Sequence, residues 1–270
     1  MMISSTSNIR IKSIRKLKEK KERQDSGLFY IEGLRIVIEA FDKGAKIKTL
    51  IVNYDLLKNE RGLALVEKAN EQGIEVLEVS RDVFESIALK QNPQGLAAVA
   101  AQQLFKLDEI DTRDFGLWTA LDSIADPGNL GTVMRTMDAV GGNGLILIGP
   151  TVDPYDTLAM RASMGALFSL KIVKASAEEF ARWKRATSIP MIGSSDKASE
   201  LYTEVEYPRD LILLMGSERQ GMQEYLEKLC NQIVRISMVG SSDSLNLSIA
   251  NAVILYEIFK QSHAGEQDKK

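Results

Sequence analysis

The chain has 270 residues, which exceeds the roughly 100 to 200 residues of one domain, so we expect two domains. Its net charge is −3. Because it has one cysteine, Cys230, and one histidine, His263, the chain cannot form an internal disulfide, a clustered His/Cys metal site or more than one histidine-based catalytic site. No apolar run reaches the about 18 residues of a membrane span and the first residues lack the apolar core of a signal peptide, so we expect a cytoplasmic protein.

The chain opens with a basic segment. Residues 10–23 contain eight basic and two acidic residues, a local charge of +6, and apolar residues at three-residue spacing predict a single helix over 8–24. Such a run is either a solvated helix face or a surface that contacts phosphates. In the second case the candidate contact residues are Arg10, Lys12, Arg15 and Lys16.

The first 105 residues predict a compact α/β domain. Apolar and β-branched runs predict strands at 28–33, 47–53, 74–79 and 95–100. Helical patterns, two of them ended by glycine, lie at 34–44, 60–72 and 83–89. Residues 106–114 are charged and are expected to form a linker.

Residues 115–262 alternate short apolar strands with helices. The predicted strands are 117–122, 145–149, 170–174, 189–193, 211–216 and 233–236. The predicted helices are 130–140, 156–167, 177–186, 222–230 and 246–261. This alternation indicates a parallel sheet covered on both faces, with ligands at the carboxyl ends of its strands. Residues 263–270 are polar and are expected to form a flexible tail.

Three loops of this second region carry dense polar residues. The first, at 126–135, contains Asn129 and places Arg135 off the apolar stripe of the following helix; the second follows strand 211–216 and contains Glu218. The third includes Ser244 and Asn246. Each could be an ordinary turn or helix cap, but their glycine spacing fits neither a dinucleotide-binding nor a Walker loop.

The three loops read DPGNLGTVMRT (126–136), LLMGSERQGM (213–222) and ISMVGSSDSLNLSIA (236–250). In this order they resemble the motifs of the SpoU (TrmH-type) RNA 2′-O-ribose methyltransferases of the SPOUT superfamily, over residues 116–260. FYIEG (29–33) and NPQGLAAV (92–99) are similar to the family's N-terminal RNA-binding domain. One departure is Ser237, where the family usually has proline, which loosens the backbone restraint on the cofactor loop.

The resemblance implies an α/β protein with a ribosomal-protein-like RNA-binding domain over 1–105 and a SPOUT domain over 115–262, in which a mostly parallel sheet contains a deep trefoil knot. It also implies an S-adenosylmethionine cofactor, an RNA substrate with 23S ribosomal RNA expected first and transfer RNA as the alternative, and a homodimer formed by the C-terminal domains that shares its active site. No metal and no membrane are expected. The implied cofactor-binding residues are Gly193, Met215, Gly216, Ile236, Met238, Ser244 and Leu245. The implied catalytic residues are Arg135, Asn129, Glu218, Ser244 and Asn246, and the basic residues at 10–16 become candidate RNA-binding residues.

Arg135 is the central residue of the implied mechanism, yet it is a poor general base because a guanidinium stays protonated in proteins. We therefore expect Arg135 to hold a phosphate next to the reacting ribose and so to fix the 2′-hydroxyl. Two hypotheses of other classes stay open. One is a catalytically silent RNA-binding protein of the same fold, and the other is a nucleotide-dependent oxidoreductase, against which the absence of a G-x-G-x-x-G loop argues.

Overall fold

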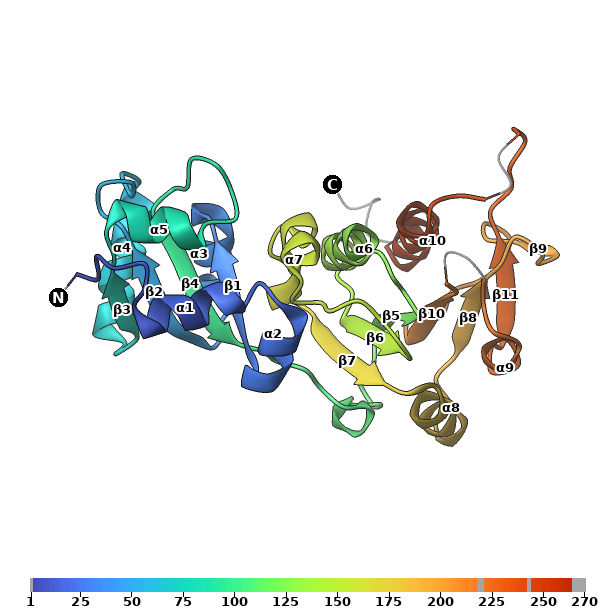
Figure 1. Ribbon diagram of the computed structural model, residues 1–270. Helices are drawn as coiled ribbons and strands as arrows, with labels where there is room; N and C mark the ends of the chain where they lie inside the picture. The colour runs from blue at the N-terminus through green and yellow to red at the C-terminus, as the bar shows by residue number, and fades with distance from the viewer. Residues whose placement is uncertain (1, 218–220, 242–243, 264–270) are drawn as a thin grey trace. The chain divides into compact units, whose positions relative to one another are not determined.

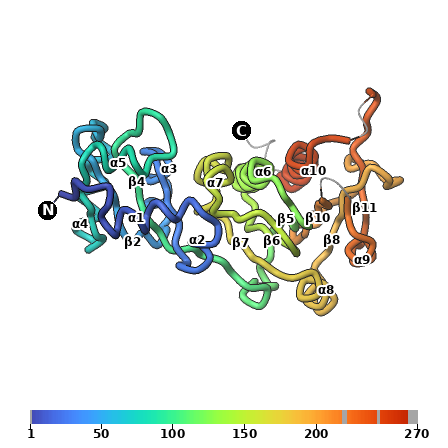
Figure 2. Tube along the Cα trace, viewed as in Figure 1, coloured from blue at the N-terminus to red at the C-terminus, as the bar shows by residue number. Residues whose placement is uncertain are grey.

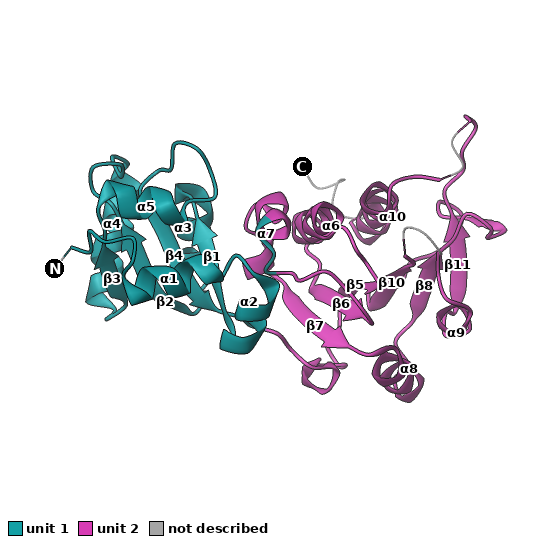
Figure 3. Ribbon diagram, in the orientation of Figure 1, with its two compact units in different colours: residues 1–103, 155–157 teal, residues 104–154, 158–270 magenta. Residues whose placement is uncertain are grey.

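The protein, described by a computed structural model over residues 2–217, 221–241 and 244–263, divides into two compact units (Figure 3). Unit 1 comprises residues 1–103 together with 155–157. Unit 2 comprises residues 104–154 and those from 158 onward. Each unit has its own sheet.

Unit 1 contains a four-stranded mixed sheet in the order β1-β4-β2-β3 (Figure 1). Strand β4 is antiparallel to β1 and β2, whereas β2 and β3 are parallel. The strands are β1 (Leu28–Glu32), β2 (Ile47–Val52), β3 (Glu75–Glu78) and β4 (Leu96–Ala101). The helices are α1 (Ile9–Lys16), α2 (Lys20–Ser26), α3 (Leu34–Asp42), α4 (Glu60–Glu71) and α5 (Arg81–Ile87).

The single helix predicted over 8–24 is wrong, because the structure has two helices, α1 and α2, there. The break follows from a contact that no local pattern reveals. Arg23 is 1% exposed, and its guanidinium donates to the carbonyl oxygens of Leu17 and Lys18 at 3.0 and 2.8 Å. These carbonyls lie just past the end of α1, so the arginine satisfies acceptors that a continuous helix would have paired itself.

Unit 2 is built on a seven-stranded sheet in the order β7-β6-β5-β10-β8-β11-β9, and every pairing in it is parallel. The predicted parallel sheet is therefore confirmed. Its strands are β5 (Leu117–Asp122), β6 (Gly144–Ile148), β7 (Lys171–Ala175), β8 (Met191–Ser194), β9 (Glu200–Leu201), β10 (Leu211–Met215) and β11 (Gln232–Arg235). The two-residue strand β9 is too short to have been predicted.

Helices cover both faces of this sheet. Helices α6, α7 and α10 lie on one side of it and α8 and α9 on the other, as Figures 1 and 2 show. The helices are α6 (Pro127–Ala139), α7 (Thr157–Ser163), α8 (Ala177–Ala186), α9 (Glu224–Glu227) and α10 (Leu247–Ser262), with 3-10 turns η1 (Leu107–Glu109) and η2 (Ala166–Phe168). Helix α7 is shorter than predicted because Met164 and Gly165 take positive φ values of 54° and 99° and end it.

The register of the central strands brings their carboxyl ends to one edge of the sheet. Met215, the last residue of β10, is paired with Leu121 of β5 and with Ser194 of β8. Val234 of β11 is in turn paired with Ser194. The loops that follow these four strands therefore emerge side by side, in the position where open α/β sheets bind ligands.

Two apolar side chains of the charged segment 106–114, Leu107 and Ile110, are 9% and 7% exposed and pack in the core of unit 2 with Phe115 and Trp118. This segment therefore stabilises unit 2 and does more than connect two domains. None of the helices in the described part of the chain is long and apolar enough to cross a membrane.

Candidate active site

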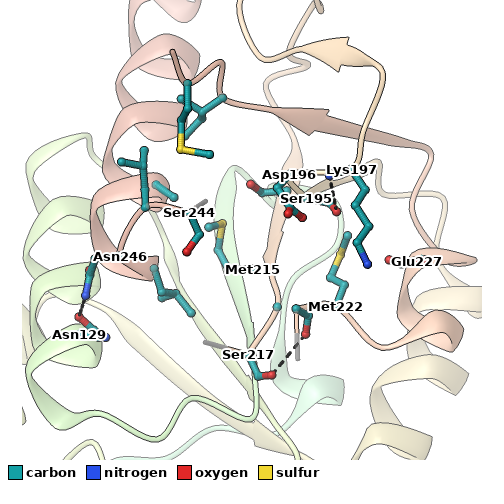
Figure 4. A pocket seen from close by; sticks show the side chains of 18 of the residues that line it. Asn129, Ser195, Asp196, Lys197, Met215, Ser217, Met222, Glu227, Ser244 and Asn246 are labelled. Atoms are coloured by element: carbon teal, nitrogen blue, oxygen red, sulfur yellow. Dashed lines mark hydrogen bonds between the residues drawn. The ribbon is translucent and has the colours of Figure 1, made fainter. Parts of the chain in front are cut away.

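A pocket of about 810 Å³ lies at the carboxyl ends of β5, β8, β10 and β11 (Figure 4). This volume is within the range of about 300 to 1,000 Å³ that is usual for pockets that bind small molecules. The residues that line it come from five segments and are Asp126, Asn129, Ser194, Ser195, Asp196, Lys197, Met215, Gly216, Ser217, Gly221, Met222, Glu227, Ile236, Met238, Ser244, Leu245, Asn246, Leu247 and Ala250.

Two helix N-termini meet at one end of the pocket. Asp126 caps α6 by accepting from the backbone N–H of Asn129 at 2.7 Å, which fixes Asn129 in the first turn. Asn246 caps α10 by accepting from the backbone N–H groups of Ser248 and Ile249. Asn246 thus has a structural role as the cap of α10.

The side chains at these two N-termini form one hydrogen-bonded group, which we call the Asn129 cluster and which comprises Asn129, Asn246 and Ser248. Asn246 Nδ2 donates to Asn129 Oδ1 at 3.0 Å (Figure 4), and Ser248 Oγ lies 3.3 Å from the same oxygen and 2.7 Å from Asn246 Oδ1. Residues 117 positions apart in the sequence are thereby brought together. The first and third predicted loops therefore belong to one site.

Six of the seven residues predicted to bind a cofactor line the pocket, and the exception is Gly193. A Cβ atom at Gly193 would lie 2.8 Å from Met222 Cε and 2.9 Å from Cys230 Sγ, so a larger residue there would displace these side chains. At Gly216 a Cβ atom would lie 2.2 Å from the backbone of Gly221 and Met222. Both glycines therefore permit a close approach within the protein itself, and Gly216 also lines the pocket.

Arg135 lies on the exposed face of α6 and is not among the residues that line the pocket. It follows Asn129 on the same helix by six residues, close to one and two-thirds turns. The described chain thus brings Asn129, Ser244 and Asn246 together but leaves Arg135 outside. Glu218, the remaining predicted catalytic residue, lies outside the described residues.

One wall of the pocket was missed by the sequence analysis. It is formed by Ser195, Asp196 and Lys197, which follow β8, and by Met222 and Glu227 (Figure 4). Ser195, Asp196 and Lys197 could have been predicted only from their position directly after a buried strand, because ligands bind at the carboxyl ends of such strands. Among the described lining residues there are three carboxylates, Asp126, Asp196 and Glu227, and one ammonium, Lys197, so the pocket is acidic.

The basic residues at the start of unit 1 have partners within the chain. Arg10 forms an ion pair with Glu75, Lys16 lies 3.5 Å from Glu22, and Arg15 donates to Ser86. Exposed ion pairs of this kind contribute little to stability, so a polyanion can compete for these cations. Lys12 is exposed on the same helix.

Neither the lone cysteine nor the lone histidine lines the pocket. Burial raises the pKa of Cys230 to about 12, so its thiol is inert near neutral pH. His263 follows the last residue of α10, where its ring stacks on Phe259 at a centroid distance of 4.2 Å. In the part of the chain that the structure describes, no group of three or more His, Cys, Asp or Glu side chains could hold a metal ion.

Comparison with known families gives two matches that together span most of the chain. Residues 116–256 match the SpoU rRNA Methylase family, and residues 8–98 match the MRM3-like substrate binding domain. Two relatives in curated collections are similar over nearly their whole length. A 23S rRNA (guanosine(2553)-2′-O)-methyltransferase of Bacillus subtilis is 28% identical over 95% of this chain and 98% of the relative. A 23S rRNA (uridine(2479)-2′-O)-methyltransferase of Streptomyces viridochromogenes is 30% identical over 92% of this chain and 88% of the relative.

Solved structures agree with these matches. An rRNA methyltransferase from Sinorhizobium meliloti, solved with bound AdoMet (S-adenosylmethionine), is 36% identical, with a TM-score of 0.88 over 97% of this chain and 98% of the neighbour. The SpoU methyltransferase AviRb from Streptomyces viridochromogenes, in complex with the cofactor AdoMet, is 28% identical, with a TM-score of 0.86 over 96% of this chain and 99% of the neighbour.

Proposed function

The chain belongs to the SpoU rRNA methylase family, and we infer that it is an RNA 2′-O-ribose methyltransferase that uses S-adenosylmethionine. The observation that carries this inference is the convergence of Asn129, Ser244 and Asn246 in one pocket at the carboxyl ends of a parallel sheet. All three belong to loops that resemble the family's motifs. A nucleotide-dependent oxidoreductase does not explain this convergence, whereas a catalytically silent RNA-binding protein of the same fold is separated from an enzyme by the methyl-transfer assay below.

The pocket fits the cofactor in shape and charge. Its volume suits a nucleoside with an amino-acid extension, and Met215, Ile236, Met238 and Leu245 offer apolar surface for an adenine ring. The acidic lining suits a sulfonium cation, because unlike charges attract strongly where water is partly excluded. When bound, the cofactor supplies an electrophilic methyl group, so the chain needs neither a metal nor a covalent intermediate.

The Asn129 cluster is suited to hold the ribose. Asn129 and Asn246 each carry an amide donor and acceptor, and their mutual hydrogen bond and the two helix caps limit their movement. We assign them to the orientation of the 2′-hydroxyl toward the methyl group, since placing two reacting atoms accounts for much of such a rate enhancement. Ser244 lines the same pocket and is assigned to the same task.

Arg135 requires a second copy of the chain in this scheme. Its place on the outside of α6 suits a site completed at a dimer interface, in which one subunit provides the pocket and the other Arg135. The same side of the sheet carries exposed apolar side chains, among them Leu158 (55% exposed), Ile249 (50%) and Tyr256 (54%). A homodimer through the C-terminal domains would cover apolar surface of this kind.

The proposed substrate is 23S ribosomal RNA, which would make the protein cytoplasmic. The named activities of the two curated relatives support this choice, and both are 23S rRNA 2′-O-methyltransferases. Unit 1 matches a substrate-binding domain and carries the exposed cations Arg10, Lys12 and Lys16 for contact with RNA phosphates. Transfer RNA stays the alternative substrate.

Methyl transfer from tritiated S-adenosylmethionine tests the activity directly. Purified 23S rRNA and bulk transfer RNA from a strain that lacks the gene are each incubated with the enzyme, and the labelled nucleotide is then mapped as a 2′-O-methyl ribose. Labelling of 23S rRNA alone is the expected result. Labelling of transfer RNA alone would replace the substrate, and no labelling of either RNA, together with tight RNA binding, would identify a silent RNA-binding protein.

A further inference from the structure

Three charged side chains of the pocket are not used by the fold. They are Asp196, Lys197 and Glu227 (Figure 4), which we call the charged wall. Among the residues that the structure describes, none of the three forms a side-chain hydrogen bond or an ion pair. The remaining carboxylate of the lining differs, because Asp126 accepts from the backbone N–H of Asn129 and caps α6. The charged wall is therefore available to a ligand.

A tight turn after β8 fixes the backbone of Lys197 beside the pocket. The backbone N–H of Ser195 donates to the carbonyl oxygen of Val234 at 3.0 Å, which extends the pairing of β8 with β11. The backbone N–H of Ala198 donates back to the carbonyl oxygen of Ser195 at 3.3 Å and closes the turn. Within it, the backbone N–H of Lys197 donates to Ser195 Oγ at 3.3 Å. The lysine side chain is exposed, but its starting point is held by the sheet.

The opposite charge comes from a different element. Glu227 is the last residue of α9, and its backbone N–H donates to the carbonyl oxygen of Gln223 at 3.1 Å. In Figure 4 the side chain of Lys197 extends along the pocket wall toward Glu227. One part of the pocket thus presents an ammonium and carboxylates together, and these groups do not neutralise one another through an ion pair in the described chain.

The sulfur atom of S-adenosylmethionine carries three groups, and the pocket has a different surface for each. The methyl group must face the Asn129 cluster, where the reacting ribose is proposed to lie. The adenosyl group suits the apolar surface that includes Met215 and Met238. The third group is an amino acid with one ammonium and one carboxylate. The charged wall, which lies across the pocket from Asn129 and Asn246 in Figure 4, is the described surface that carries charges of both signs.

We propose that the charged wall binds the amino-acid end of the cofactor, with Lys197 on its carboxylate and Asp196 and Glu227 on its ammonium. The assignment follows from the signs of the charges. Lys197 is the one cation among the described lining residues, and the carboxylate is the one anion of the cofactor. A lysine ammonium has three donors for such an acceptor. Binding at the adenine and at the amino acid fixes the sulfur between them, which sets the position of the methyl group.

The test uses calorimetry on the full-length protein with two probes. S-adenosylhomocysteine retains both charges of the amino acid, whereas its decarboxylated analogue has an aminopropyl group in that place and lacks the carboxylate. An acidic lining alone would favour the analogue, because the analogue has a net positive charge. The proposal predicts the opposite order. The wild type should bind S-adenosylhomocysteine about tenfold or more tightly than the analogue, since the analogue cannot accept a charge-assisted hydrogen bond from Lys197.

Variants of the charged wall assign this preference to its residues. Lys197→Met removes the charge and keeps an unbranched side chain of similar length. It should weaken the binding of S-adenosylhomocysteine about tenfold without weakening that of the analogue, so the preference disappears. Lys197→Arg should keep the preference. A deaminated analogue, which retains the carboxylate, tests the other half: Asp196→Asn/Glu227→Gln should lose the preference of the wild type for S-adenosylhomocysteine over it.

Lys228 provides the matched control. It directly follows Glu227, pairs with Glu224 at 2.7 Å and does not line the pocket, so Lys228→Met should change the affinity for neither probe. The proposal fails if the wild type binds S-adenosylhomocysteine and the decarboxylated analogue within twofold of each other. It also fails if Lys197→Met weakens both by the same factor, as a distorted wall would. The proposal rests on the proposed function, whose own failure is distinct, because the wild type would then bind no S-adenosylhomocysteine.

Discussion

The cap of α10 allows the structural role of Asn246 to be separated from its proposed role in catalysis. Its Oδ1 accepts from two backbone N–H groups, and its Nδ2 donates to Asn129. Replacing an N-cap asparagine by alanine costs about 1 kcal/mol, which for a unit of this size lowers the melting temperature by about 2 to 4 °C. Asn246→Ala should therefore lose stability and activity together.

Asn246→Ser separates the two effects. Serine caps helices about as well as asparagine, so the melting temperature should stay near that of the wild type. Its hydroxyl is too short to replace the amide that reaches Asn129, so kcat should fall about a hundredfold through loss of alignment.

The measurements are thermal unfolding and steady-state methyl transfer to 23S rRNA at saturating substrate. The control is Ser176→Ala, which removes the side-chain cap of α8 on the other side of the same sheet and should lower stability without changing kcat. Wild-type kcat in Asn246→Ser would refute a catalytic role for the Asn129 cluster. An unchanged melting temperature in Asn246→Ala would refute the cap as a source of stability.

Four further results are expected. Arg135→Ala should lower kcat about a hundredfold or more and leave the cofactor affinity unchanged. Arg135→Lys should recover little activity, because an ammonium group cannot make the two parallel hydrogen bonds of a planar guanidinium. Full activity of the alanine variant in the methyl-transfer assay would exclude Arg135 from the reaction. Mixing Arg135→Ala with Asn246→Ala subunits should restore part of the activity if each site draws on two subunits, whereas the absence of any recovery would argue for sites within one chain. Replacing Lys12 and Lys16 by glutamine should reduce the slope of log RNA affinity against log salt concentration by about 0.7 to 0.9 for each lost phosphate contact. An unchanged slope in filter binding would show that these lysines form only a solvated helix face. With its pKa near 12, Cys230 at pH 8 has a thiolate fraction of about 1 in 10,000, far below that of a free thiol, so mass spectrometry should find its alkylation at least about a hundredfold slower in the folded than in the unfolded protein.

The sheet of unit 2 could be predicted from the sequence because its strands are buried on both faces. Such strands are continuous apolar runs, as in 145–149 and 211–215, and the helices between them leave parallel pairing as the natural arrangement. The break between α1 and α2 could not be predicted in this way. It depends on the guanidinium of Arg23 folding back onto Leu17 and Lys18, and the local spacing of apolar residues contains no sign of that contact.

The site was predictable to the extent that its residues sit in dense polar loops. Asn129 and Asn246 were expected from such loops, and the structure joins them by a hydrogen bond. The wall that contains Asp196 and Glu227 was not, because ordinary surface residues form it and only the register of β8, β10 and β11 brings them to the pocket. Gly216 lines the pocket as predicted, and the structure adds that a side chain there would collide with the backbone of Gly221 and Met222, which the sequence alone did not reveal.

The acidic charge of the pocket bears on how the proposed enzyme would hold both a cationic cofactor and a polyanionic RNA. Three carboxylates and one ammonium favour the cationic cofactor over its neutral product, which assists product release after the methyl group has left. The same carboxylates repel the RNA backbone that must approach them. A phosphate beside the reacting ribose therefore needs a cation from elsewhere, because Lys197 is the one cationic side chain among the described residues that line the pocket. Arg135, placed outside the pocket on the helix that carries Asn129, would meet this need if it came from a second subunit, and the exposed lysines of unit 1 can contact other phosphates of the RNA.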